Sequence, residues 1–152
     1  MRQVSTAFLS LVLTAAVAGA QGRPTVKHTN PSTLSKPSGY THVVEVTGGR
    51  TLYVAGQVAL NKAGAVVGAG DLKAQTQQVF ENLKLALAAA GATLDNVVKI
   101  TVFMTDASQI QTFRDVRDRY FTGPPPASTL VQVVRLFRPE ILIEIEAVAV
   151  AQ

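Results

Sequence analysis

The segment Leu142–Ala149 reads LIEIEAVA, and its side chains alternate between the two faces of a strand. In the wider run 141–150 both faces carry apolar side chains: Ile141, Ile143 and Ile145 on one, Leu142, Val148 and Val150 on the other. A sheet that is apolar on both faces is covered on both. In so small a chain helices cover one face, so the other needs a second subunit. The sequence therefore predicts an oligomer.

The segments before this strand show strand and helix patterns in turn. Two β-branched runs within 40–58 flank Gly48-Gly49, a turn signal that predicts a hairpin. Apolar residues recur at helical spacing after Asp71, a good N-cap, and again over 108–120. Further strands are predicted at 98–104, 129–134 and 141–150. The order ββαβαββ indicates an α+β fold, a mixed sheet with two helices on one face.

Composition excludes several classes of protein. The chain has 152 residues, 47% of them hydrophobic and 16% charged, enough for one globular domain with its own core. Without cysteine it has no disulfide, no thiolate zinc site and no cysteine nucleophile, and its two histidines predict no metal site. The formal charge is +4, but no basic run is interleaved with aromatic residues, so a nucleic-acid partner is not expected.

The N-terminus has the pattern of an export signal. Arg2 precedes an apolar run over 7–18, and Ala18-Gly19-Ala20 is a small-x-small cleavage pattern. We expect residues 1–20 to be a secretory signal peptide and Gln21 the new N-terminus. The mature protein is then periplasmic or secreted, without a membrane partner. Residues 21–39, rich in proline and serine, are expected to form an extended lead-in to a domain over 40–152.

Three motifs resemble the signature stretches of the Rid/YjgF family, the reactive-intermediate imine and enamine deaminases and their relatives. They are Val54–Val58 (VAGQV), Pro126–Thr129 (PAST) and Leu142–Ala149 (LIEIEAVA), and the resemblance covers essentially all of 40–151. It implies a chorismate-mutase-like fold, a homotrimer, and small-molecule clefts between subunits. It also implies hydrolysis of imines or enamines to a carbonyl compound and ammonia without a cofactor, so the expected ligand is similar to an imino or keto acid.

Three residues match the site that the resemblance implies. Glu144 stands where the family has a glutamate that positions or activates water. Gly56 and Tyr40 stand at substrate-binding positions of the cleft. Glu144 and Glu146 share one face of their strand, and the neighbouring charge raises the pKa of a water-activating carboxylate. The alternative is that Glu144 is a structural carboxylate at a subunit interface.

Three other positions depart from that pattern. Ser128 stands where the deaminases have an arginine that clamps the substrate carboxylate, and Leu130 replaces a common cysteine. Serine offers one neutral hydrogen bond in place of a bidentate charged pair, so binding of a 2-imino acid is expected to weaken. Arg114 replaces a cleft asparagine. It either projects into the cleft as a substitute cation or belongs to a solvated charged face with Arg117, paired with Asp118.

Two functions remain open at this point. The first is a cofactor-independent imine or enamine hydrolase that acts through Glu144. The second is a non-enzymatic small-molecule-binding or protective protein on the same fold. A nuclease is not expected, because there is no pair of histidines for acid–base cleavage of RNA.

Overall fold

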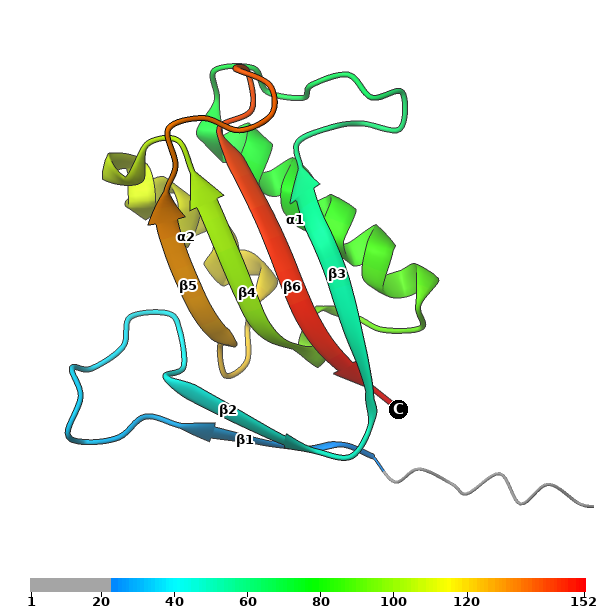
Figure 1. Cartoon of the computed structure of the whole chain (residues 1–152), viewed down its shortest axis with the longest axis vertical. Coiled ribbons are helices and arrows are strands. Elements are labelled where there is room, and N and C mark those ends of the chain that lie inside the picture. Colours follow the sequence, from blue (N-terminus) through cyan, green and yellow to red (C-terminus); the bar gives the residue numbers. More distant parts are fainter. Residues whose placement is uncertain (1–22) are drawn as a thin grey trace, which may run out of the picture.

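A mixed four-stranded sheet forms the centre of the molecule (Figure 1). This computed structural model describes residues 23–152, so the predicted signal peptide lies outside the described residues. The strand order is β3-β6-β4-β5. The bounds are Arg50–Val58 for β3, Val97–Met104 for β4, Ala127–Gln132 for β5 and Ile143–Ala151 for β6. β6 runs antiparallel to both β3 and β4, and β5 runs parallel to β4.

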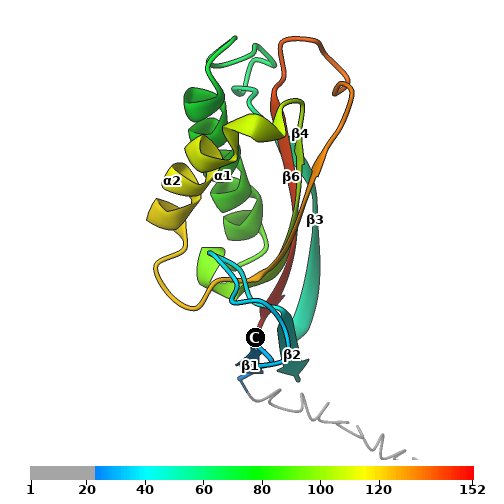
Figure 2. The same cartoon turned by 90° about the vertical axis from the view of Figure 1, so that its left-hand side faces the viewer.

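Two helices, α1 (Leu72–Ala89) and α2 (Ile110–Tyr120), lie on the same side of the sheet (Figure 2). Asp71 caps α1 by accepting a hydrogen bond from the Ala74 N–H at 3.0 Å. Short 3-10 turns at Leu94–Asn96 and Ala107–Gln109 lead into β4 and α2. Within residues 23–152, no helix is long and apolar enough to cross a membrane. The predicted α+β fold with two helices on one face is confirmed.

The inner face of the sheet and the apolar faces of the helices form one core. Ile143 and Ile145 of β6 are fully buried in it, as are Phe80 of α1 and Val102 of β4. Phe113 of α2, 1% exposed, closes the core on the side of β5. This packing fixes which residues of β4, β5 and β6 face the helices and which face away.

The predicted hairpin over 40–58 is wrong. β2 (Val43–Thr47) pairs with β1 (Thr25–Thr29), antiparallel, in a separate two-stranded sheet. Gly48 and Gly49 both have left-handed φ, 76° and 80°, and they turn the chain into β3 without pairing it to β2. β1 lies inside the segment expected to be an extended lead-in. Its sequence, TVKHT, has no face made of apolar side chains, so the usual signal of a strand is missing. It is a strand because it is hydrogen-bonded to β2.

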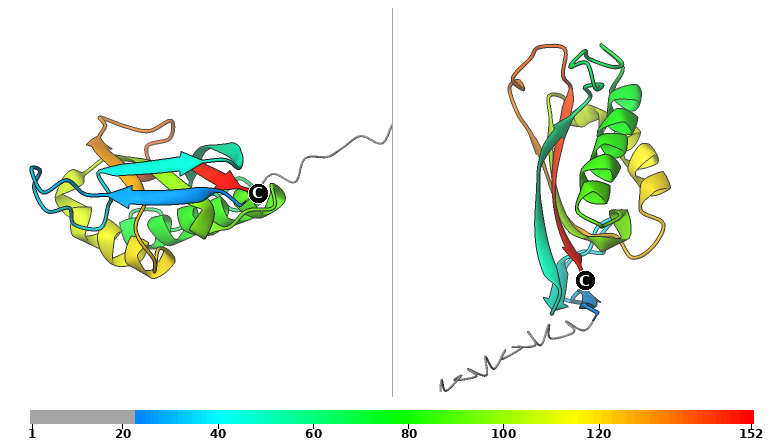
Figure 3. Two further views of the ribbon diagram at one scale, coloured as in Figure 1. Left: turned by 90° about the horizontal axis from the view of Figure 1, so that it is seen from below. Right: turned by 90° about the vertical axis from the view of Figure 1, so that its right-hand side faces the viewer.

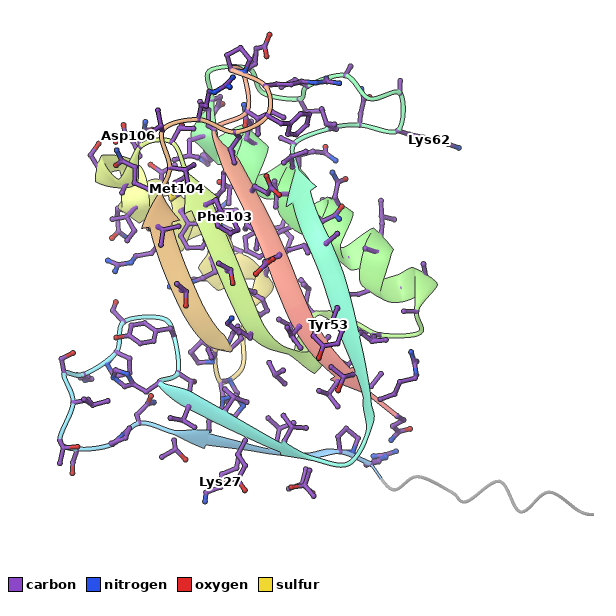
Figure 4. All side chains as sticks on the ribbon, in the orientation of Figure 1. Lys27, Tyr53, Lys62, Phe103, Met104 and Asp106 are labelled. Atoms are coloured by element: carbon purple, nitrogen blue, oxygen red, sulfur yellow. The ribbon has the colours of Figure 1, made fainter. Side chains whose placement is uncertain are left out.

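The sheet face opposite the helices has no cover among residues 23–152 (Figure 3, right). We call it the open face. Tyr53 is 84% exposed and Val131 is 40% exposed, and Phe103 and Val148 are half-buried. Tyr53 and Phe103 are labelled on this face in Figure 4. Large apolar side chains on an uncovered sheet mark an interaction surface.

Candidate functional site

Glu144 lies on the open face, beside Gly56. In the sheet, Glu144 of β6 is paired with Val58 of β3 and with Phe103 of β4. The register between β3 and β6 shifts between Val54 and Gln57, a bulge that brings the Gly56 backbone against the carboxylate. A Cβ on Gly56 would overlap Oε1 of Glu144. The glycine therefore makes room for the carboxylate, and the structure brings these two predicted residues together.

The surroundings of Glu144 favour its protonated form. Burial raises the pKa of its carboxyl above the ordinary value for glutamate, and the nearby charge of Glu146 raises it further. Within residues 23–152 the carboxylate makes no hydrogen bond and no ion pair. A half-buried carboxylate with a raised pKa can accept a proton from water and return it.

A second group of predicted residues lines a small cavity on the helix side of the sheet. Ser128 and Leu130 of β5 are paired with Ile100 and Val102 of β4, which are buried under the helices, so they face the same way. The cavity has a volume of about 140 Å³. Its lining consists of Ser38, Tyr40, Ile110, Phe113, Arg114, Arg117, Ser128 and Leu130. We call it the arginine cavity.

The segment before β2 brings Tyr40 to this cavity. Thr41, 2% exposed, donates its backbone N–H to the Pro126 carbonyl at 3.0 Å and forms an isolated bridge with Ala127. Its hydroxyl donates to the Pro125 carbonyl. These bonds hold residues 38–41 beside the start of β5. The Tyr40 ring, half-buried, packs edge-on against His42 with 5.2 Å between the ring centroids.

One of the two interpretations of α2 is a solvated charged face that includes Arg117, and for Arg117 this interpretation is wrong. Arg117 is 5% exposed, and its guanidinium lies 5.5 Å from the Phe113 ring centroid. It holds Asp118, with Nε 2.8 Å and Nη2 2.7 Å from Oδ1. Asp118 is thus an ion-pair partner of Arg117, and the expected Arg114–Asp118 pair is not among the ion pairs of residues 23–152.

Sequence reasoning missed Arg117 although a signal was present. Phe113, Val116 and Tyr120 form the apolar stripe of α2, and Arg117 falls on that stripe, four residues after Phe113. A second signal is Gly39, which precedes Tyr40 and has φ 72°. A Cβ on Gly39 would overlap the Arg117 guanidinium. The glycine leaves the space into which the buried arginine extends.

The predicted site is therefore not assembled within one chain. Glu144 and Gly56 lie on the open face, whereas Tyr40, Arg114, Ser128 and Leu130 meet in the arginine cavity on the helix side. The four-stranded sheet separates the two groups. A larger hollow of about 480 Å³, beside the C-terminal end of α1, is lined by none of these residues. Within 23–152, no group of three or more His, Cys, Asp or Glu side chains could hold a metal ion.

Comparisons with known proteins agree with this fold. A model of the protein family described as Endoribonuclease L-PSP matches residues 32–151. The chain is 37% identical over 111 residues, 73% of its length, to the mouse protein named 2-iminobutanoate/2-iminopropanoate deaminase, of which 80% is covered. The crystal structure of the Rid-family protein YyfB from Yersinia pestis is similar with a TM-score of 0.77 and 41% identity, covering 83% of this chain and 98% of that one. The structure of E. coli TdcF with bound serine has a TM-score of 0.62 and 30% identity, with 67% of this chain and 81% of that one covered.

Proposed function

The chain belongs to the Rid/YjgF family, and from this premise we propose that it hydrolyses small reactive imines or enamines to a carbonyl compound and ammonia. The observation that carries the proposal is Glu144, a half-buried carboxylate beside a glycine on the open face, with no hydrogen-bond or ion-pair partner in the described part of the chain, residues 23–152. The similarity to the mouse protein named as an iminobutanoate and iminopropanoate deaminase supports the same reaction class.

Hydrolysis of an imine needs one group that accepts and returns protons, and in this proposal the group is the carboxylate of Glu144. Glu144 takes a proton from a water molecule, whose oxygen adds to the carbon of the C=N bond, and it passes this proton to the nitrogen to give a carbinolamine. Glu144 then takes the proton of the carbinolamine hydroxyl and passes it to the nitrogen, the C–N bond breaks, and the products are a C=O group and ammonia. Water supplies both the oxygen and the hydrogens that this reaction requires. A carboxylate with a raised pKa suits both directions of proton transfer.

Assembly completes the site in this proposal. The open face carries Tyr53, Phe103, Val131 and Val148, and it is the face on which Glu144 stands. A neighbouring copy that covers it would bury the apolar side chains and enclose Glu144 in a cleft. The arginine cavity of the neighbour then supplies the ligand-binding side chains, including Tyr40. We propose a homotrimer, the state implied by the family resemblance, with one such cleft at each interface.

A binding protein without catalytic activity is the second candidate. It is favoured by Ser128, whose hydroxyl offers a ligand in the arginine cavity one neutral hydrogen bond. Such a protein would hold the same small molecules in the same clefts.

Ammonia release from freshly generated 2-iminopropanoate separates the two candidates. We expect the protein to speed release about 100-fold or more over buffer, because one positioned acid–base group contributes about that much. The measurement is a coupled ammonia assay, with heat-denatured protein as control. Release at the buffer rate by a protein that still binds pyruvate would favour the binding protein and overturn the hydrolase.

We also propose that residues 1–20 direct export to the periplasm or the medium. The support is the apolar run over 7–18 and the Ala18-Gly19-Ala20 pattern. Protein expressed in a Gram-negative host is expected in the periplasmic fraction with Gln21 as its first residue, as N-terminal sequencing would show. Replacing Ala18 and Ala20 by Lys should block the cleavage. Protein that starts at Met1 in the cytoplasm would contradict export.

A further inference from the structure

We propose that the guanidinium of Arg117 binds the carboxylate of the ligand in the arginine cavity. The inference rests on the proposed function, since it assigns the residue that would select an acidic imine over a neutral one. Arg114 and Arg117 both line this cavity, and no aspartate or glutamate among the described residues does. A cavity with two cations and no anion in its wall favours a negatively charged group.

The second observation is the free edge of the buried guanidinium. Asp118 binds Arg117 through Nε and Nη2, which form one of the two bidentate edges of the group. Within residues 23–152, Nη1 makes no hydrogen bond. The edge formed by Nη1 and Nη2 therefore retains donors for a second carboxylate, in the fork geometry that arginine offers. Asp118 is largely solvent-exposed, so water screens its charge.

Arg117 is held in place before any ligand binds. Asp118 fixes one edge, the Phe113 ring lies against the guanidinium, and Gly39 leaves space where a side chain would overlap it. A side chain fixed in this way loses little conformational entropy on binding. Arg114, in contrast, is only half-buried and has no such contacts among the described residues. Of the two cations, Arg117 is the better anchor.

The size of the cavity limits the ligand. A volume of about 140 Å³ is room for roughly five water molecules at ~30 Å³ each. This suits the carboxylate end of a small acid, whose remaining atoms would lie in the cleft between subunits. Ser128 lies in the same wall and offers a hydroxyl to the ligand.

The test compares an anionic probe with a neutral one of the same shape. Pyruvate and pyruvamide are titrated by calorimetry into the full mature protein. Arg117→Met is expected to weaken pyruvate binding about 10- to 100-fold, because hydrogen bonds to charged groups contribute ~1.5–3 kcal/mol. Pyruvamide binding should change less than about twofold. Arg119→Met, an exposed position on the same helix, should change neither, and Arg114→Met should have a smaller effect than Arg117→Met.

Three further results decide between an anchor and a structural role. In the double variant Arg117→Met, Ser128→Arg a guanidinium returns to the cavity from β5, and pyruvate binding should recover at least partly. Gly39→Ala keeps the charge but displaces the group, so it should weaken pyruvate as well, which is a second test if Arg117→Met does not fold. Equal losses for both probes, a larger effect of Arg114→Met, or no pyruvate binding by the unmodified protein would each overturn the proposal. Pyruvate binding that depends on Arg117, without ammonia release, would support the role of Arg117 in ligand binding and refute only the proposed hydrolysis.

Discussion

Replacing Glu144 by Gln is expected to lower the rate of ammonia release from 2-iminopropanoate by about 100-fold or more, with the fold unchanged. Glutamine has nearly the same shape but cannot accept the proton of the attacking water, a step that contributes roughly 10²–10⁴-fold. The measurement is initial ammonia release at saturating substrate. Glu146→Gln is the matched control, because it removes a carboxylate from the same face of β6 two residues away. Equal losses in the two variants would contradict a specific role for Glu144.

Glu146→Gln is also expected to change the pH dependence of ammonia release. Burial and the charge of Glu146 both raise the pKa of Glu144. A general base works in its deprotonated form, so the rate should fall as pH drops through that raised pKa. Glu146→Gln removes the like charge, so the acid limb of the profile should move to lower pH. Measuring the rate against pH for both proteins tests this, and a shift to higher pH would contradict it.

Replacing Tyr53 by Glu is expected to convert the assembly to monomers and to abolish ammonia release. Tyr53 is 84% exposed on the open face. Covering that face with a neighbouring copy would bury an unpaired carboxylate, at a cost of several kcal/mol per interface. Sedimentation equilibrium should give about three times the monomer mass for the unmodified protein and the monomer mass for the variant.

Leu85→Glu is the matched control for the interface. Leu85 is 70% exposed on α1, on the other side of the sheet. The same charge at that position should leave the mass and the activity unchanged. Dissociation by Leu85→Glu but not by Tyr53→Glu would place the interface on the helices and contradict the proposed cleft.

The elements that could be predicted from sequence are those whose signals are local. Asp71 sets the start of α1 through its own side chain, and the alternation around Glu144 sets the faces of β6. The pairing of β2 with β1 could not be predicted, because the choice of partner is made by hydrogen bonds between segments about twenty residues apart. Gly48-Gly49 signals a turn but not which strands it joins.

Sequence reasoning named candidate site residues but not which of them lie on the same face of the sheet. Tyr40, Arg114, Ser128 and Leu130 do meet in one cavity, and Gly56 does meet Glu144. That the two groups lie on opposite faces follows from the register of β4 with β5 and β6, which no single motif contains. Arg117 was missed because a charged residue on a helix usually faces water, and here Gly39 and Phe113 make a buried place for it.

Mixed assemblies test most directly whether each site is shared between copies. Two inactive forms, Glu144→Gln and Ser128→Phe, which fills the arginine cavity, are co-expressed with different affinity tags, and assemblies carrying both tags are isolated. If one copy supplies Glu144 and its neighbour the cavity, one of the three interfaces in every mixed trimer combines two intact halves, and roughly a third of the unmodified activity should return. Activity no greater than that of the two parent forms, in assemblies shown to contain both, would contradict a cleft shared between subunits.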